Sequence, residues 1–252
     1  MSCRLDELYK FPRTRHLFDV GGSGVSRDDL LMDKEEANTF YSGRHRQTVV
    51  SVEEKVDGAN LGISISPSNY RLLVQNRAHY VNSQTHKQFS GLDQWLEEHS
   101  AGLFEVLVPG RHVLFGEWLF AKHSIHYTRM PGYFMAFDIY DKESERFYSR
   151  RERNRRLEGS GIPTVRLVAE CPIQGKDHVL RLLDTQSAFY DGPCEGIYLR
   201  IDDDNQGGDT QASSGDVGWL KHRAKLVRPD FLQQIEEQWT RQKLTKNIVV
   251  YS

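Results

Sequence analysis

The sequence predicts an α+β fold in which antiparallel sheets are flanked by helices. Short segments of alternating apolar and polar residues recur along the 252-residue chain, a pattern typical of strands that bury one face. Helical patterns are fewer and do not alternate regularly with these strands, which argues against a parallel sheet built from β-helix-β units. No internal repeat or low-complexity tract is found.

The composition is that of a soluble globular chain. Hydrophobic residues make up 38% and charged residues 27%, so the chain can bury a core. No apolar run approaches the ~18 residues of a membrane span, and the first residues, MSCRLDE, lack the apolar core of a secretion signal. The three isolated cysteines support neither a disulfide framework nor a cysteine-based zinc site. We therefore expect an intracellular protein, in the cytoplasm or the nucleus.

The first 42 residues are weakly patterned, and we expect them to form an N-terminal extension of a domain at residues 43–252. Gly21 to Gly24 lack the following Lys-Ser/Thr of a P-loop, so we interpret them as an ordinary loop. Asp57-Gly58 supplies a turn between the first two strands. The first three strands are expected at residues 48–54, 61–66 and 71–77.

Helices and strands are mixed in the middle of the chain. Further strands are expected at 111–120 and 133–140. Ser149 could cap an arginine-rich helix that Gly159 would end. An earlier helix near residues 91–101 has one face made of Leu92, Trp95, Leu96 and His99.

The last third of the chain predicts two helices and two strands. The strands are expected at 195–201 and 217–227, and the acidic, Gly- and Ser-rich residues 202–216 between them are expected to form a mobile loop. A helix near 177–189 is expected to point Val179, Leu180 and Leu183 inward. The final helix is indicated by Phe231, Ile235 and Trp239.

Lys55 stands at the end of a strand pattern, immediately before the Asp57-Gly58 turn. Val50 and Val52 alternate with polar residues upstream, so the sheet would hold the lysine stem and direct its amine into a cleft. An amine held in this way is a candidate covalent nucleophile.

Three acidic residues interrupt apolar strand patterns, where an unpaired carboxylate would be costly. They are Glu117 in FGEW, Asp138 in FMAFDIY and Glu195 in EGIYL. Each acid alone could be a satisfied structural residue. Their combination with Lys55 and with a cationic strand face is harder to explain by packing; that face carries Lys221, Arg223 and Lys225.

The net charge of −2 does not indicate general attraction to nucleic acid, so a polyanion would have to be bound by a local patch. Five arginines crowd residues 150–156, and Arg44 and Arg46 precede the lysine strand. The arginine-rich helix is either a solvated face or a phosphate-binding edge for RNA. If it binds RNA, the contacts are expected from Arg151, Arg153 and Arg155.

In their order, these residues resemble the motifs of the covalent nucleotidyltransferases, the superfamily of polynucleotide ligases and mRNA capping enzymes. Asn60 and Phe137-Asp138 look most like the nick-sealing RNA ligases of the phage RNA ligase 2 type. The resemblance spans roughly residues 49–231 and implies the nucleotidyltransferase fold, an ATP-grasp-like ligase adenylation domain. The motifs are Lys55 to Asn60 (motif I), Phe115 to Glu117 (III), Phe137-Asp138 (IIIa), Glu195 to Ile197 (IV) and Arg223 to Lys225 (V).

The resemblance implies an ATP-dependent RNA ligase that uses Mg²⁺ or Mn²⁺. Lys55 would attack the α-phosphorus of ATP, form a lysyl–AMP and pass the AMP to the 5′-phosphate of RNA, which is then joined to a 3′-OH end. An ordinary lysine is almost fully protonated at neutral pH, so nearby cations would have to suppress its charge. Arg223 and Lys225 would do so and would neutralise charge on the phosphates.

The remaining roles also follow from the resemblance. Glu117 would hold the ribose, Phe137 would stack on adenine and Glu54 would accept its amino group. Asn60 and Arg77 complete this nucleotide-binding set and would face the 5′-phosphate end of the second substrate. Glu195 and Asp57 would engage the metal.

Two departures from the family pattern leave alternatives open. Motif V often carries two lysines, whereas the pair here is Arg223 and Lys225, or Lys221 and Arg223 if the register differs. The chain also stops soon after this motif, which leaves no room for the C-terminal domain of many ligases. The alternatives to a ligase are a GTP-using capping enzyme and a catalytically idle module that binds RNA ends.

Overall fold

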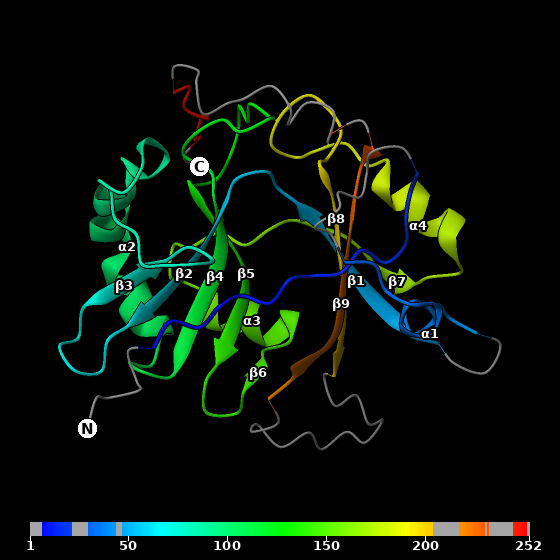
Figure 1. Cartoon of the computed structure of the whole chain (residues 1–252), viewed down its shortest axis with the longest axis horizontal. Coiled ribbons are helices and arrows are strands. Elements are labelled where there is room, and N and C mark those ends of the chain that lie inside the picture. The colour runs from blue at the N-terminus through cyan, green and yellow to red at the C-terminus, as the bar shows by residue number, and fades with distance from the viewer. Residues whose placement is uncertain are drawn as a thin grey trace.

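Two antiparallel sheets lie side by side in the computed structural model, with helices on their outer sides and the helix at residues 150–157 in contact with strands of both (Figure 1). The structure describes residues 7–21, 30–43, 47–203, 217–229, 231 and 244–250. This arrangement confirms the predicted α+β class. No helix among the described residues is long and apolar enough to cross a membrane.

The first sheet has four strands in the order β7-β1-β8-β9. All neighbours in it are antiparallel. Residues 15–17 lengthen it at the β9 edge, because Lys225 N–H donates to the carbonyl of Arg15 (2.9 Å) and Leu17 N–H donates to the carbonyl of Lys225 (3.0 Å). The strands are β1 (Val49–Lys55), β7 (Leu167–Pro172), β8 (Gly196–Asp203) and β9 (Trp219–Val227).

The second sheet has five strands in the order β3-β2-β4-β5-β6. Its strand β2 follows β1 after three residues, so the Asp57-Gly58 turn carries the chain from one sheet to the other. A Cβ at Gly58 would lie 2.5 Å from the carbonyl oxygen of Trp118, so glycine is needed at this close approach. The strands are β2 (Ala59–Ile65), β3 (Leu72–Gln75), β4 (His112–Trp118), β5 (Phe134–Asp141) and β6 (Arg146–Phe147).

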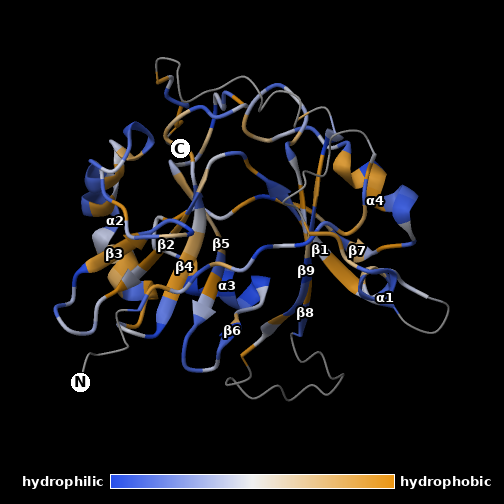
Figure 2. Cartoon of the chain, in the orientation of Figure 1, coloured by the Kyte–Doolittle hydropathy of each residue, from blue (hydrophilic) through white to orange (hydrophobic). Residues whose placement is uncertain are grey.

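Two of the helices each cover one sheet. Helix α2 (Leu92–Val106) packs Leu92, Trp95 and Leu103 on the five-stranded sheet. Helix α4 (Lys176–Leu183) packs on the four-stranded sheet, and its apolar side is visible in Figure 2. The other helical segments are α1 (Lys34–Asn38), the 3₁₀ turn η2 (Lys87–Phe89) and α3 (Arg150–Leu157).

Helix α3 begins as the sequence predicts. The Ser149 side chain accepts a hydrogen bond from Glu152 N–H. The chain leaves the helix through Gly159, whose φ of +77° lies in the left-handed region. The residues of α3 are hydrophilic apart from Leu157, as the colouring of Figure 2 shows for most of the helix.

Several predictions for individual elements were wrong or incomplete. Helix α4 ends at Leu183, and Leu180, expected inward, is exposed, whereas Val179 and Leu183 are buried. Leu180 falls on the outer side because the buried stripe follows the four-residue spacing of Val179 and Leu183. Strand β7 was not predicted, because its residues are mostly half-buried at a sheet edge and do not alternate clearly.

Two predictions lie largely outside the described residues. These are the loop expected at residues 202–216, of which 204–216 are not described, and the final helix indicated by Phe231, Ile235 and Trp239, of which only Phe231 is described. The described part of the N-terminal segment packs closely on the domain. Leu17 and Phe40 belong to the same core as Val50. The boundary at residue 42 stays a prediction.

Candidate active site

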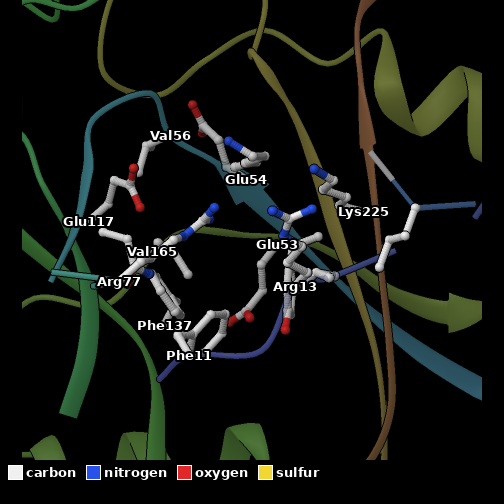
Figure 3. A pocket seen from close by; sticks show the side chains of 15 residues that line it. Phe11, Arg13, Glu53, Glu54, Val56, Arg77, Glu117, Phe137, Val165 and Lys225 are labelled. Atoms are coloured by element: carbon white, nitrogen blue, oxygen red, sulfur yellow. The ribbon is translucent and has the colours of Figure 1, made fainter. Parts of the chain in front are cut away.

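A pocket of about 270 Å³ lies between the two sheets, and we call it the central pocket. Side chains from both sheets and from the N-terminal segment point into it (Figure 3). Of the residues predicted from the sequence, those lining it are Glu54, Lys55, Asn60, Arg77, Glu117, Phe137 and Lys225. The structure therefore brings together most of the predicted site.

Lys55 ends strand β1 opposite Gly196 of β8, which places it beside Glu195. Its Nζ donates to Glu195 Oε1 at 2.5 Å. Burial lowers the pKa of Lys55, but the carboxylates of Glu195 and Glu117 outweigh this effect, so its pKa is raised above the ordinary value. In the free protein the nucleophile candidate is therefore a protonated, ion-paired amine.

Glu117 lies across the pocket on strand β4, where it pairs with Asn60 of β2. Its Oε1 accepts a hydrogen bond from Gly58 N–H at 3.2 Å. Burial raises the pKa of Glu117 to about 7, against the opposing charges of Lys55 and Arg77. Near neutral pH, a carboxyl group with such a pKa can accept a hydrogen bond from a bound hydroxyl group when ionised and donate one to it when protonated.

Asp57 has a structural task in addition to its predicted one. Its Oδ2 accepts hydrogen bonds from the backbone N–H of Ser124 (2.7 Å) and Ile125 (3.1 Å). Its own N–H donates to the Tyr127 hydroxyl at 2.8 Å. Asp57 therefore holds the loop after β4 against the turn that follows Lys55, and its role towards a metal stays a prediction.

The carboxylates fit a magnesium or manganese ion shared with a substrate. Glu195 Oε2 is buried and has no hydrogen-bond partner within the described part of the chain. Among the described residues, no three His, Cys, Asp or Glu side chains form a complete metal cluster. Mg²⁺ is commonly held by one or two carboxylates together with substrate phosphates, and Glu195 meets that requirement.

Phe137 forms an apolar wall of the central pocket, and its backbone is firmly held. Its carbonyl oxygen accepts hydrogen bonds from Arg153 Nη1 (2.5 Å) and Arg200 Nη1 (3.1 Å). The ring of Phe11 packs against the ring of Phe137 in an edge-to-face arrangement, with the ring centroids 5.3 Å apart. The flat aromatic ring of Phe137 therefore offers a surface on which a planar base can stack.

Glu54 lines the pocket with a carboxylate that already has protein partners. It accepts hydrogen bonds from Ser187 Oγ at 2.5 Å and from Ala188 N–H at 3.3 Å, and Arg166 lies 3.5 Å away. These contacts fix the carboxylate beside the pocket. Its contact with a base amino group stays a prediction.

Strand β9 brings one of its three alternating cations into the pocket, and that cation is Lys225. Arg223, predicted as catalytic, is not among the residues that line it. Its guanidinium lies over the rings of Phe11 (4.8 Å) and Phe147 (4.5 Å), and its Nη1 is 3.6 Å from Asp138. Successive side chains on one face of a strand are ~7 Å apart, so Arg223 lies beyond the pocket that Lys225 reaches. Lys221 lies still further along and is 58% exposed.

The arginine-rich helix α3 divides its side chains between surface and interior. Arg151 and Arg155 are exposed. Arg153, predicted to contact RNA, is fully buried and pairs with Glu53 at 2.6 Å, so that prediction is wrong. It occupies the helix face of Leu157, four residues later, which packs on the core. Arg44 and Arg46 lie outside the described residues.

That the N-terminal segment reaches the pocket was not predicted from the sequence. Phe11, Arg13 and Thr14 line it, together with Val165 and Tyr198. Tyr198 could have been found, because it lies two residues after Gly196 on a motif strand. The segment FPRTR has no strand alternation, and only its mixture of aromatic and basic residues was a signal.

Comparisons with known proteins agree with this geometry. A family model described as RNA ligase matches residues 48–227. No curated protein matches the sequence. Among solved structures, the chain is similar to Naegleria gruberi RNA ligase with pyrophosphate, at 16% identity and a TM-score of 0.57, over 86% of this chain and 60% of that chain.

Two variants of the same Naegleria ligase, each solved with ATP and Mn, are also similar. One has 14% identity and a TM-score of 0.58 over 92% of this chain and 59% of that chain. The other has 15% identity and a TM-score of 0.56 over 77% and 53%. The chain thus spans less than two thirds of the ligase it resembles, and the likeness confirms the fold. Because the family model covers most of the sequence, including both sheets, the chain belongs to the RNA ligase family.

Proposed function

We propose that the protein is an ATP-dependent RNA ligase that joins 3′-OH and 5′-phosphate RNA ends through a lysyl–AMP intermediate. One observation carries this proposal: Lys55 Nζ, 2.5 Å from Glu195, lies in a pocket that Lys225, Glu117 and Phe137 also line. A binding module would need neither a lysine nucleophile nor these buried acids. Solved structures of the Naegleria ligase with ATP and Mn support the choice of nucleotide and metal.

In the first step the amine of Lys55 must lose the proton that Glu195 now helps to retain. When the Glu195 carboxylate is engaged elsewhere, the like charge of Lys225 in the same pocket would favour loss of this proton. The neutral Nζ then attacks the α-phosphorus of ATP. The nitrogen–phosphorus bond forms, the bond to pyrophosphate breaks and the proton leaves to solvent. Mg²⁺ or Mn²⁺, when bound, supplies positive charge that stabilises the phosphate oxygens.

In the later steps the AMP moves from the protein to RNA. An oxygen of the RNA 5′-phosphate attacks the AMP phosphorus, and Lys55 leaves and regains a proton. The RNA 3′-OH then attacks the 5′-phosphorus and releases AMP. Throughout, Glu117 would hold the ribose and Phe137 the adenine, while Asn60 and Arg77 face the 5′-phosphate end. We further propose that these reactions take place inside the cell.

Labelling with radioactive nucleotide tests the covalent step. The protein is incubated with α-labelled ATP or GTP and Mg²⁺ or Mn²⁺ and then separated on a denaturing gel. Label from ATP should remain on the protein, and Lys55→Ala should abolish it. Lys55→Arg should fail as well, because a guanidinium remains protonated and is not nucleophilic. Label from GTP instead would favour a capping-type enzyme, and no label from either nucleotide would favour an idle binding module.

A further inference from the structure

Residues 9–17 cross the molecule from the five-stranded to the four-stranded sheet, and we call them the N-terminal strap (Figure 1). At one end Tyr9 stacks on Tyr140, with ring centroids 3.6 Å apart, and its carbonyl accepts from Gln75 Nε2 at 2.6 Å. At the other end, Leu17 donates to the carbonyl of Lys225 and Arg15 accepts from its N–H. The strap is therefore anchored to the backbone of the one β9 cation that lines the central pocket.

Between its anchors, the strap directs the side chains of Arg13 and Arg15 to different places. Arg13 lines the central pocket. Arg15, two residues later, forms an ion pair with Glu36 beside helix α1, and 45% of its side chain is exposed. Figure 3 shows Arg13 and Lys225 on one side of the pocket, with Glu117 and Arg77 across from them. Phe11 of the strap contacts the ring of Phe137.

The charges around this part of the pocket favour an anion. The two carboxylates that precede Lys55 are already bound within the protein: Glu53 pairs with Arg153, and Glu54 accepts from Ser187. Arg13 and Lys225 line the pocket beside these two acids, whose charges are compensated within the protein. A guanidinium presents paired N–H donors that match two oxygens of one phosphate, which a lysine ammonium does not.

We propose that Arg13 is a further nucleotide-binding residue, which contacts the phosphates of ATP beside Lys225 and is placed there by the N-terminal strap. This inference rests on the proposed function, because it assigns a residue of the same pocket to the same substrate. It also gives residues that precede motif I a direct part in nucleotide binding. Phe11 on the same strap supports the adenine wall, so the strap contacts both ends of the nucleotide.

Affinity measurements on protein that cannot react provide the test. In a Lys55→Ala background, calorimetry compares ATP with adenosine, which lacks the phosphates, for Arg13→Ala, Arg13→Lys and Arg15→Ala. Arg13→Ala should weaken ATP binding by roughly ten- to a hundredfold, the range for one charged hydrogen-bonding group. Adenosine binding should change less than about twofold. Arg13→Lys should recover part of the affinity for ATP.

Arg15→Ala is the matched control, because it removes the same charge from the same strap on the side away from the pocket. It should leave the affinity for both ligands unchanged. Equal ATP affinity in Arg13→Ala and its parent would overturn the inference, as would an equal loss for ATP and adenosine, which would indicate a merely structural role. Thermal melting of each variant verifies that it is folded. Labelling of the protein with Lys55 intact separates the two proposals. If that protein accepts label from ATP, an unchanged ATP affinity or an equal loss for both ligands in Arg13→Ala refutes only the role of Arg13. If it accepts no label, the proposed function itself fails.

Discussion

The ion pair between Lys55 and Glu195 should make the Lys55 amine less reactive, because it favours the protonated form. The ion pair raises the pKa of Lys55, and only the deprotonated amine can attack phosphorus. The rate of lysine adenylylation in a single turnover should therefore rise with pH from 6 to 9. In Glu195→Gln the residual activity should reach half its maximum at a lower pH, because the carboxylate that retains the proton is gone. A pH profile identical to that of the unmodified protein would contradict this account of the pair.

Glu117 and Glu195 should matter for chemistry and little for folding. Glu117→Ala and Glu195→Ala should each lower the rate of adenylylation by ~10²-fold or more, the scale of losing one positioned electrostatic group. Both carboxyl groups are buried, and burial raises their pKa values. Removing a buried carboxylate relieves a desolvation cost, and the Lys55 amine that Glu195→Ala leaves without its partner is 29% exposed and can be solvated, so both variants should still melt cooperatively. Loss of cooperative melting would instead assign these acids to the structure.

The sequence predicted the residues whose chemistry conflicts with their local pattern. Glu117 and Glu195 stood out because a carboxylate is costly within an apolar strand. Arg153 could not be assigned correctly, because a basic side chain in a polar pattern is expected at the surface. Its burial depends on a partner from a distant segment, Glu53.

Among the elements, strands with runs of apolar residues were predicted, and segments held mainly by contacts with their neighbours were not. Strands β4 and β5 carry runs of buried apolar residues and lie close to their expected positions. The N-terminal strap has no such run. It is held by backbone hydrogen bonds to β9 and by stacking of Tyr9 on Tyr140, contacts that no local pattern records.

Helix α3 offers a test of RNA binding with a control on the same element. Arg151→Gln with Arg155→Gln removes two exposed charges and keeps good helix formers. This double variant should adenylylate normally, because that step needs only ATP and metal. If the helix borders the RNA path, sealing should fall and the salt dependence of RNA binding should become shallower, by up to about one log unit per lost contact.

Arg153→Gln on the same helix should behave in the opposite way. It leaves Glu53 buried without its partner, and breaking a buried ion pair costs roughly 3–5 kcal/mol of unfolding free energy. Urea unfolding measures this loss.

For the Arg151 and Arg155 double variant, the contrary outcome is sealing activity and a salt dependence of RNA binding that both match the unmodified protein. That outcome would show that the exposed side of α3 is only a solvated face.

At the scale of the whole molecule, each sheet has its own hydrophobic core, and the central pocket lies between the two sheets. The sequence predicted the fold class of this arrangement but not the pairing of its strands. Order within each sheet depends on long-range contacts such as β1 with β7, which are more than a hundred residues apart. The family resemblance implied the nucleotidyltransferase fold without this pairing, and the structure shows that the motifs of the site lie on strands of both sheets.

The five-stranded sheet contains a buried histidine that should make the stability of the domain depend on pH. His112 is 2% exposed. Its Nδ1 accepts from Val108 N–H at 3.1 Å, and its Nε2 lies 3.1 Å from the hydroxyl of Tyr148, which donates to Asp141. Burial lowers the pKa of His112 to about 4, and the charges of Arg156 and Arg111 act in the same direction against Asp141.

Because the unfolded chain binds the His112 proton at its ordinary pKa of about 6.5, unfolding takes up a proton between pH 6.5 and 4. The free energy of unfolding should therefore fall as the pH drops through this window, by roughly 2–3 kcal/mol at pH 4.5 from this residue alone. Asp141, whose pKa is lowered to about 2, loses its contribution only at lower pH. Urea unfolding at pH 7 and pH 4.5 measures the difference, with His112→Gln as the control that cannot titrate. The variant should be less stable at pH 7 and lose less stability on acidification, whereas equal losses in the two proteins would show that His112 does not govern the acid sensitivity of the fold.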